Sequence, residues 1–90
     1  MLEIVNLHGI LFPNGNIYMP ITTAQQFGAS VATARRKLGL TQRDLALAIG
    51  TGDRFIVELE RGKPTAQLGK ALAAAQAVGI RLGDLSAGAG

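Results

Sequence analysis

Residues 41–64 read TQRDLALAIGTGDRFIVELERGKP and contain two short helical patterns on either side of a glycine. The positions that would face inward in these two segments are all small or apolar: Leu45, Ala46, Ile49, Ile56 and Leu59. Gly50 lies between the segments, in a turn where a side chain would strain the backbone. Two short helices joined by a turn of about three or four residues with a glycine are typical of a helix-turn-helix. The stretch therefore predicts this motif.

A further helix is predicted before the motif. It begins after Thr22 or Thr23, which can cap it, or after Ser30 on a shorter count, and it ends at Gly39. Its expected inward face is made of Phe27, Val31, Ala34 and Leu38. Both starting points remain open from the sequence, because Gly28 weakens the helical pattern between them.

The bounds of the two motif helices follow from their flanking residues. Thr41 caps the first, residues 42–49, and Gly50 closes it. Gly52 or Asp53 starts the second, which stops at the next glycine and proline.

Apolar spacing predicts one more helix, which ends at Gly79 and places on one face Leu68, Ala71, Leu72, Ala75 and Val78. The alternating triplet Ile80-Arg81-Leu82 then predicts a short strand. We therefore expect an all-α fold of four to five helices, with a helix-turn-helix domain in residues 21–79. A dimerisation strand and a tail would follow in residues 80–90.

Residues 1–20 differ in character from the rest, since they are β-branched, aromatic and almost uncharged. Residues 13–15, Pro-Asn-Gly, form a turn signal between the apolar residues 10–12 and 17–19. This pattern predicts an amino-terminal arm with a small hairpin. The alternative is that Met19 is the natural start and that the preceding segment is an upstream extension.

Composition narrows the functional class. The 90 residues suit a single domain or a domain plus an arm, and they include no cysteine and one histidine. We expect no metal site, no cofactor and no enzymatic activity, because no set of ligands or nucleophile–base pair is in view. The apolar runs are too short for a membrane span, and the amino terminus carries Glu3 without Lys or Arg. A cytoplasmic location is expected.

Charge is distributed unevenly along the chain. The net charge is +3, but residues 35–63 hold seven basic side chains against four acidic ones, while residues 1–34 hold only Glu3. A basic middle segment indicates a polyanionic partner. A solvated helical surface is the alternative interpretation.

The motif residues carry a family resemblance. The run R-R-K-L-G-L-T-Q from Arg35 to Gln42, followed by D-L-A-x-x-I-G and I-x-x-L-E-R-G-K-P-T, resembles repressor-type helix-turn-helix proteins (the Cro/C1 or XRE family). Within that family, R-F-I-V-E-L-E-R-G-K-P-T with the ending A-V-G-I-R-L is similar to the HipB-type antitoxins. The resemblance covers residues 22–83. The chain departs from the pattern at Thr51-Gly52 and at Val57.

The resemblance implies how each position would meet DNA. The front of the second motif helix would face base edges through Gly52, Asp53, Arg54, Phe55 and Glu58. Arg54 is the best single candidate for a guanine contact, and Asp53 can accept from a cytosine amine. For Phe55, partial burial in the core is an equally good interpretation, and Glu58 could hold Arg54 instead of touching DNA.

Contacts to the DNA backbone are expected from polar and basic residues around the motif: Arg36, Lys37, Thr41, Gln42, Arg43, Arg61 and Lys63. Gln42 would act together with the free amides at the start of its helix. The resemblance also implies that Arg35 and Glu60 form a structural ion pair between helices.

Assembly and partners are implied in the same way. Unless residues 1–19 provide a strand partner, Ile80, Arg81 and Leu82 would pair with their copies to form a homodimer on a palindromic double-stranded operator. The protein would repress its own operon and restrain a HipA-like kinase toxin. Two alternatives are a stand-alone or phage-type repressor without a toxin, and a protein-interaction module that has lost DNA binding. The second is motivated by Asp53, Val57 and Glu58 on the outward face.

Overall fold

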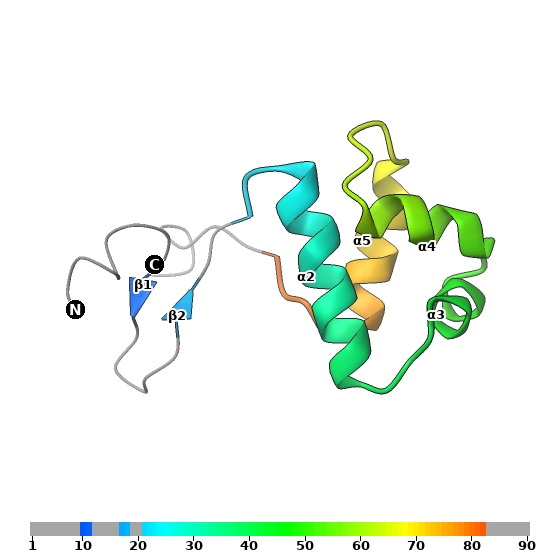
Figure 1. The fold of residues 1–90 in the computed structure, drawn as a ribbon, viewed down its shortest axis with the longest axis horizontal. Helices are drawn as coiled ribbons and strands as arrows, with labels where there is room; N and C mark the ends of the chain where they lie inside the picture. Colours follow the sequence, from blue (N-terminus) through cyan, green and yellow to red (C-terminus); the bar gives the residue numbers. More distant parts are fainter. Residues whose placement is uncertain (1–9, 12–16, 19–20, 83–90) are drawn as a thin grey trace.

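The computed structural model describes residues 10–11, 17–18 and 21–82 (Figure 1). Its helices are α2 (Ala24–Lys37), α3 (Gln42–Ala48), α4 (Asp53–Glu60) and α5 (Leu68–Ala77). The expected all-α, repressor-like helix-turn-helix fold is therefore confirmed. Most of the arm and the tail after Leu82 lie outside the described residues, so the proposed division into arm, domain and tail stays a prediction.

Two short strands lie in the arm. β1 (Ile10–Leu11) and β2 (Ile17–Tyr18) pair antiparallel, with Ile10 opposite Tyr18 and Leu11 opposite Ile17. They flank the predicted turn, whose own residues lie outside the described part of the chain.

Helix α2 begins at the earlier of the two positions that the sequence left open. The Thr23 hydroxyl accepts a hydrogen bond from the Gln26 amide (3.0 Å), and the Gln26 side-chain oxygen accepts one from the Thr23 amide (3.2 Å). This capping box satisfies amides that the first turn would otherwise leave unpaired. A start after Ser30 is therefore wrong. The chain leaves the helix at Gly39, whose φ of 73° favours glycine.

Gly28 has a packing role that the sequence did not reveal. Helices α2 and α4 lie side by side (Figure 1), and Gly28 is buried where they meet. A Cβ at this position would overlap the carbonyl oxygen of Leu59 and lie 3.0 Å from the carbonyl carbon of Glu60. The glycine weakens α2 locally, but it permits the closest contact between these two helices.

The core lies among all four described helices and is built from one cluster of small and branched residues: Val31, Leu45, Ala46, Ile56, Leu59, Ala71, Ala74, Ala75 and Val78. Leu45 and Ile56 are fully buried, and burial of such a side chain contributes about 1.5–3 kcal/mol to folding. These two residues fill the space between the motif helices, as expected.

Three leucines that the spacing placed on inward faces are exposed. Leu38 is 57% exposed because it is the residue after the last turn of α2, where the chain turns away. Leu68 and Leu72 are 69% and 44% exposed, because α5 packs through a stripe of alanines instead. Small side chains let α5 approach the other helices closely, which rotates its leucines outward.

The triplet predicted as a strand is not paired within the described part of the chain. Residues 80–82 form no ladder with another described segment, and the Ile80 amide donates to the Ala75 carbonyl (2.9 Å) in the turn that ends α5. Ile80 packs against the core, whereas Leu82 is 47% exposed. The expected strand therefore stays a prediction.

Candidate nucleic-acid interface

The turn between α3 and α4 sets the direction of α4. Gly50 has a φ of 71°, and the following Thr51 amide donates back to the Ala46 carbonyl (2.9 Å). Ala46 is fully buried, and its small side chain allows the two helices to pack closely. Gly52 is the N-cap of α4 and provides no side-chain hydrogen bond. The backbone amides in the first turn of α4 therefore donate no hydrogen bond to a capping side chain.

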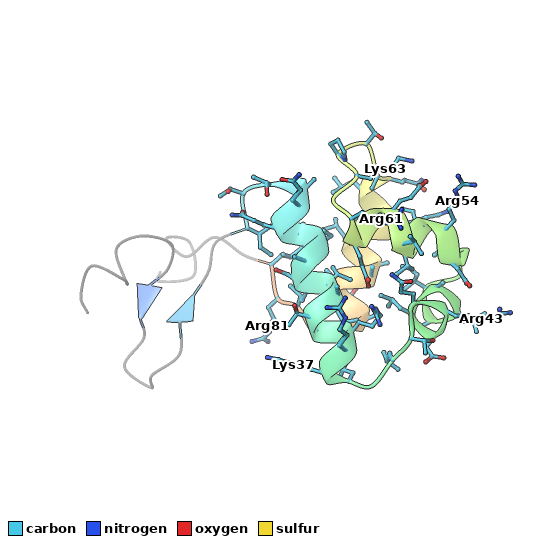
Figure 2. All side chains as sticks on the ribbon, in the orientation of Figure 1. Lys37, Arg43, Arg54, Arg61, Lys63 and Arg81 are labelled. Carbon is cyan, nitrogen blue, oxygen red and sulfur yellow. The ribbon has the colours of Figure 1, made fainter. Side chains whose placement is uncertain are left out.

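The leading end of α4 is exposed among the residues that the structure describes. Gly52, Asp53 and Arg54 are all exposed, and the Arg54 side chain is 91% exposed. Figure 2 shows Arg54 extending away from the body at the end where α3 and α4 meet, with Arg43 at the same end. A long cationic side chain that projects from a helix start can reach into a groove of DNA.

Glu58 lies one turn further along α4 and contacts two cations. One carboxylate oxygen accepts from Lys63 Nζ at 2.9 Å, and the other lies 3.4 Å from Arg54 Nε. The hydrogen bond and charge of Lys63, with a smaller effect of Arg54, hold the pKa of the Glu58 carboxyl below its usual range. Glu58 therefore stays ionised at neutral pH, and its charge is balanced locally.

Phe55 is turned toward the body. Its side chain is half-buried against the core, and Lys70 Nζ on α5 lies 5.7 Å from the ring centroid. An ammonium group over an aromatic ring is attracted to the π face. This contact matches the core interpretation of Phe55; its thymine contact stays a prediction.

Behind the exposed end lies a buried polar network. Arg35 donates to both Glu60 oxygens, from Nε at 2.7 Å and from Nη2 at 3.0 Å, and to the Leu40 carbonyl at 2.8 Å. The pair expected between Arg35 and Glu60 is thus present. Burial raises the pKa of Glu60, but hydrogen bonds from Arg35 and Gln42 outweigh it and leave that pKa below its usual range.

Gln42 has a role that the sequence did not indicate. Its side-chain nitrogen donates to Glu60 Oε1 at 3.0 Å, so the first residue of α3 is tied to the last residue of α4. The neighbouring Thr41 hydroxyl accepts from the Asp44 amide at 3.0 Å in a capping box. The side chains of Gln42 and Thr41 thus already have partners within the protein. Their expected contacts to the DNA backbone would use donors and acceptors that these hydrogen bonds leave free.

The basic residues expected on the DNA backbone do not share one face. Arg61 and Lys63 lie along α4 and the loop after it, whereas Lys37 lies on the α2 side, away from Arg54 (Figure 2). Arg36 is exposed on the last turn of α2. Arg43, Arg61 and Lys63 flank α3 and α4, and the charge of Arg36 also acts on Glu60 at the end of α4.

Other kinds of site have little support in the described residues. No three His, Cys, Asp or Glu side chains in that part of the chain gather as metal ligands would. One cavity of about 150 Å³ lies between α2 and α5 and is lined mainly by Phe27, Leu59, Pro64 and Leu68, without an acid–base pair. None of the described helices combines the length and hydrophobicity of a transmembrane span.

Comparisons with known proteins agree with this geometry. A family model described as helix-turn-helix, HTH_3, matches residues 31–85. A protein of Sinorhizobium fredii, named as the uncharacterized HTH-type transcriptional regulator y4mF, is 46% identical over 68 residues, which are 76% of this chain and 90% of that protein.

Solved structures share the fold at lower identity. The HipB–O4 20mer complex and the HipA–HipB–O2–O3 complex each contain a chain with a TM-score of 0.68 and 21% identity. The alignment covers 74% of this chain and 94% of each of those chains. The likeness shows that the four described helices are arranged as in HipB.

Proposed function

The chain belongs to the helix-turn-helix family HTH_3, and on this premise we propose that it is a sequence-specific DNA-binding transcriptional repressor. The observation that carries the proposal is the uncovered leading end of α4, with Arg54 91% exposed. The relative from Sinorhizobium fredii is named as a transcriptional regulator, which supports the same role. A protein that binds operator DNA acts in the cytoplasm of a bacterial cell, which is the location we propose.

Base contacts would come from the start of α4. Arg54 would donate to guanine O6 and N7, and Asp53 would accept from a cytosine amine. The Gly52 backbone can approach DNA closely because no side chain stands in the way. A bidentate Arg–guanine contact gives about 1–3 kcal/mol of discrimination against other base pairs.

Phosphate contacts would come from cations that flank the motif. Arg43, Arg61 and Lys63 are exposed beside α3 and α4, and we propose them as the main contacts, with Thr41 and Gln42 at the start of α3. Arg36 and Lys37 stay as further candidates on α2. Each phosphate neutralised by a cation releases counterions, so that affinity falls steeply with salt.

A homodimer would provide two such surfaces. Support comes from residues 80–82, which lack a strand partner among the described residues, and from the exposed side chains of Leu72 and Leu82. Pairing of the two triplets across a two-fold axis would satisfy their backbone groups and bury Ile80 and Leu82. Sedimentation of the full chain tests this: a dimer is expected, and a monomer at micromolar concentration would contradict it.

We further propose that the protein is the antitoxin of a HipA/HipB-like operon. The support is the HipB-like fold together with the complex of HipB with HipA among its structural neighbours. A kinase-like reading frame next to the gene, whose product copurifies with this chain, is the expected finding. A stand-alone repressor remains if no such frame is present.

A mobility-shift assay with the DNA upstream of the gene, at low and at moderate salt, tests the repressor role. A shift at low salt that persists at moderate salt for the upstream DNA, but not for a scrambled duplex, is expected. No shift at either salt would leave the protein-interaction module as the function. The structure weakens the case for that module, because Glu58 is paired with two cations.

A further inference from the structure

Glu58 occupies the outward face of α4 between two basic side chains. Its Oε2 lies 3.4 Å from Arg54 Nε, and its Oε1 lies 2.9 Å from Lys63 Nζ. Arg54 is 91% exposed, whereas Glu58 is 34% exposed. The carboxylate is therefore anchored to the body and the guanidinium projects beyond it.

The contact through Nε leaves the outer edge of the guanidinium free. A guanidinium has five N–H groups in a fixed plane, and Nε supplies one of them. The remaining four belong to Nη1 and Nη2, and two parallel donors from this set are what guanine O6 and N7 require. A contact at Nε would thus restrain the guanidinium without using the donors that would meet a base.

Lys63 makes this arrangement compatible with DNA. An isolated carboxylate facing a phosphate backbone would be repelled, but Lys63 balances the charge of Glu58. The free protein gains little from such exposed ion pairs, since water screens them. When DNA binds, its groove would exclude water from the contact between Glu58 and Arg54 and so strengthen it. The Arg54 guanidinium would then be oriented as it meets the base.

We propose that Glu58 is a specificity-determining positioning residue, which orients Arg54 for bidentate contact with guanine and does not itself contact a base. The inference rests on the proposed DNA-binding function and deepens it by naming how one base pair is selected. This role differs from the direct base contact that the family resemblance implied for Glu58.

The test measures the affinity of the full chain for a duplex selected from a randomised library and for duplexes changed at single base pairs. The parent, Arg54→Ala, Glu58→Ala and the double variant are compared. Arg54→Ala identifies the guanine pair. Glu58→Ala is expected to reduce discrimination at that same pair by at least about five-fold, the low end for one bidentate contact. The double variant should lose no more than Arg54→Ala alone.

Asp44→Asn on α3 is the matched control, because it removes one negative charge from the exposed surface of the motif, keeps an oxygen that can accept from the Thr41 amide, and does not contact Arg54. It should leave discrimination at that guanine unchanged. Loss at a different base pair in Glu58→Ala would mean that Glu58 contacts a base directly. Additive losses in the double variant, or no loss in Glu58→Ala, would also overturn the inference, while sequence-selective binding by the parent would still uphold the proposed function.

A second measurement needs no DNA. The Arg54 Nε–Hε resonance of the free protein should shift in Glu58→Gln and stay in place in Asp44→Asn. An unchanged resonance in Glu58→Gln would overturn the inference even if the protein selects a sequence. If the parent selects no sequence from the library, the proposed function fails, and the role of Glu58 fails with it.

Discussion

Arg35 holds both carboxylate oxygens of Glu60, at 2.7 Å from Nε and 3.0 Å from Nη2, and so joins the last turn of α2 to the last residue of α4. Both side chains are nearly buried, at 9% and 6% exposed. Gln42 donates to the same carboxylate from the start of α3. The Glu60 carboxylate thus connects α2, α3 and α4 at the C-terminal end of α4, whereas the N-terminal end of α4 is exposed.

Glu60→Ala should lower the free energy of unfolding by about 3–5 kcal/mol, because it leaves the Arg35 charge buried without a partner. Urea denaturation followed by circular dichroism measures the change. The paired variant with Arg35→Met and Glu60→Leu is expected to lose much less, since no charge is left behind. A paired variant that is as unstable as Glu60→Ala would contradict this account of the network.

Stability should fall in acid through the same carboxyl. The pKa of Glu60 is lower in the folded protein than in the unfolded chain, so its contribution is complete above the unfolded value of about 4.3. The contribution is lost as pH falls through the folded value. The melting temperature of the parent should therefore drop below about pH 4, and Glu60→Gln should show a smaller drop. Equal drops would show that Glu60 does not contribute.

Gly28→Ala should destabilise the protein by about 1–3 kcal/mol or more, because the new methyl group would overlap the Leu59 carbonyl. The matched control is Gly69→Ala on α5, where a Cβ would meet no atom within 4 Å. This control should stabilise the chain by about 0.5–1 kcal/mol through helix propensity alone. Thermal melts of the two variants should therefore shift in opposite directions. Equal shifts would mean that α2 and α4 do not pack as closely as described.

The sequence predicted the features that depend on local chemistry. Thr23, Thr41 and Gly50 carry capping and turn signals that act within a few residues, and each marks a helix end or turn in the structure. The exposed positions of Leu38 and Leu72 were missed. They depend on where α2 ends and on how closely alanines let α5 approach, and both are tertiary effects that spacing alone does not encode.

The candidate site also combines features that local sequence predicts with features that depend on tertiary structure. The exposure of Arg54 could be expected from its place at the start of a motif helix, and its pairing with Glu58 from their separation of one turn. The contacts of Gln42 with Glu60 and of Lys63 with Glu58 join residues across a turn or loop. No periodic pattern predicts them, because they depend on the angle between elements.

Basic residues should differ in their effect on DNA affinity. Arg43→Ala should reduce the salt dependence, lowering the slope of log K against log salt concentration by about 0.9 for one lost phosphate contact. Lys37→Ala should lower that slope less, because Lys37 lies on the α2 side of the body, away from Arg54 (Figure 2). Fluorescence anisotropy at several salt concentrations measures both. A larger change in slope for Lys37→Ala than for Arg43→Ala would instead place the DNA along α2.

A nuclear magnetic resonance titration of the full chain with its upstream duplex tests the central claim most directly. Backbone amide shifts should concentrate at the exposed start of α4, residues 52–55, and at the start of α3, residues 41–43, and Arg54→Ala should weaken them. Shifts confined to α5 or to the outer face of α2, with residues 52–55 unchanged, would contradict the assignment of α4 as the DNA-contacting helix.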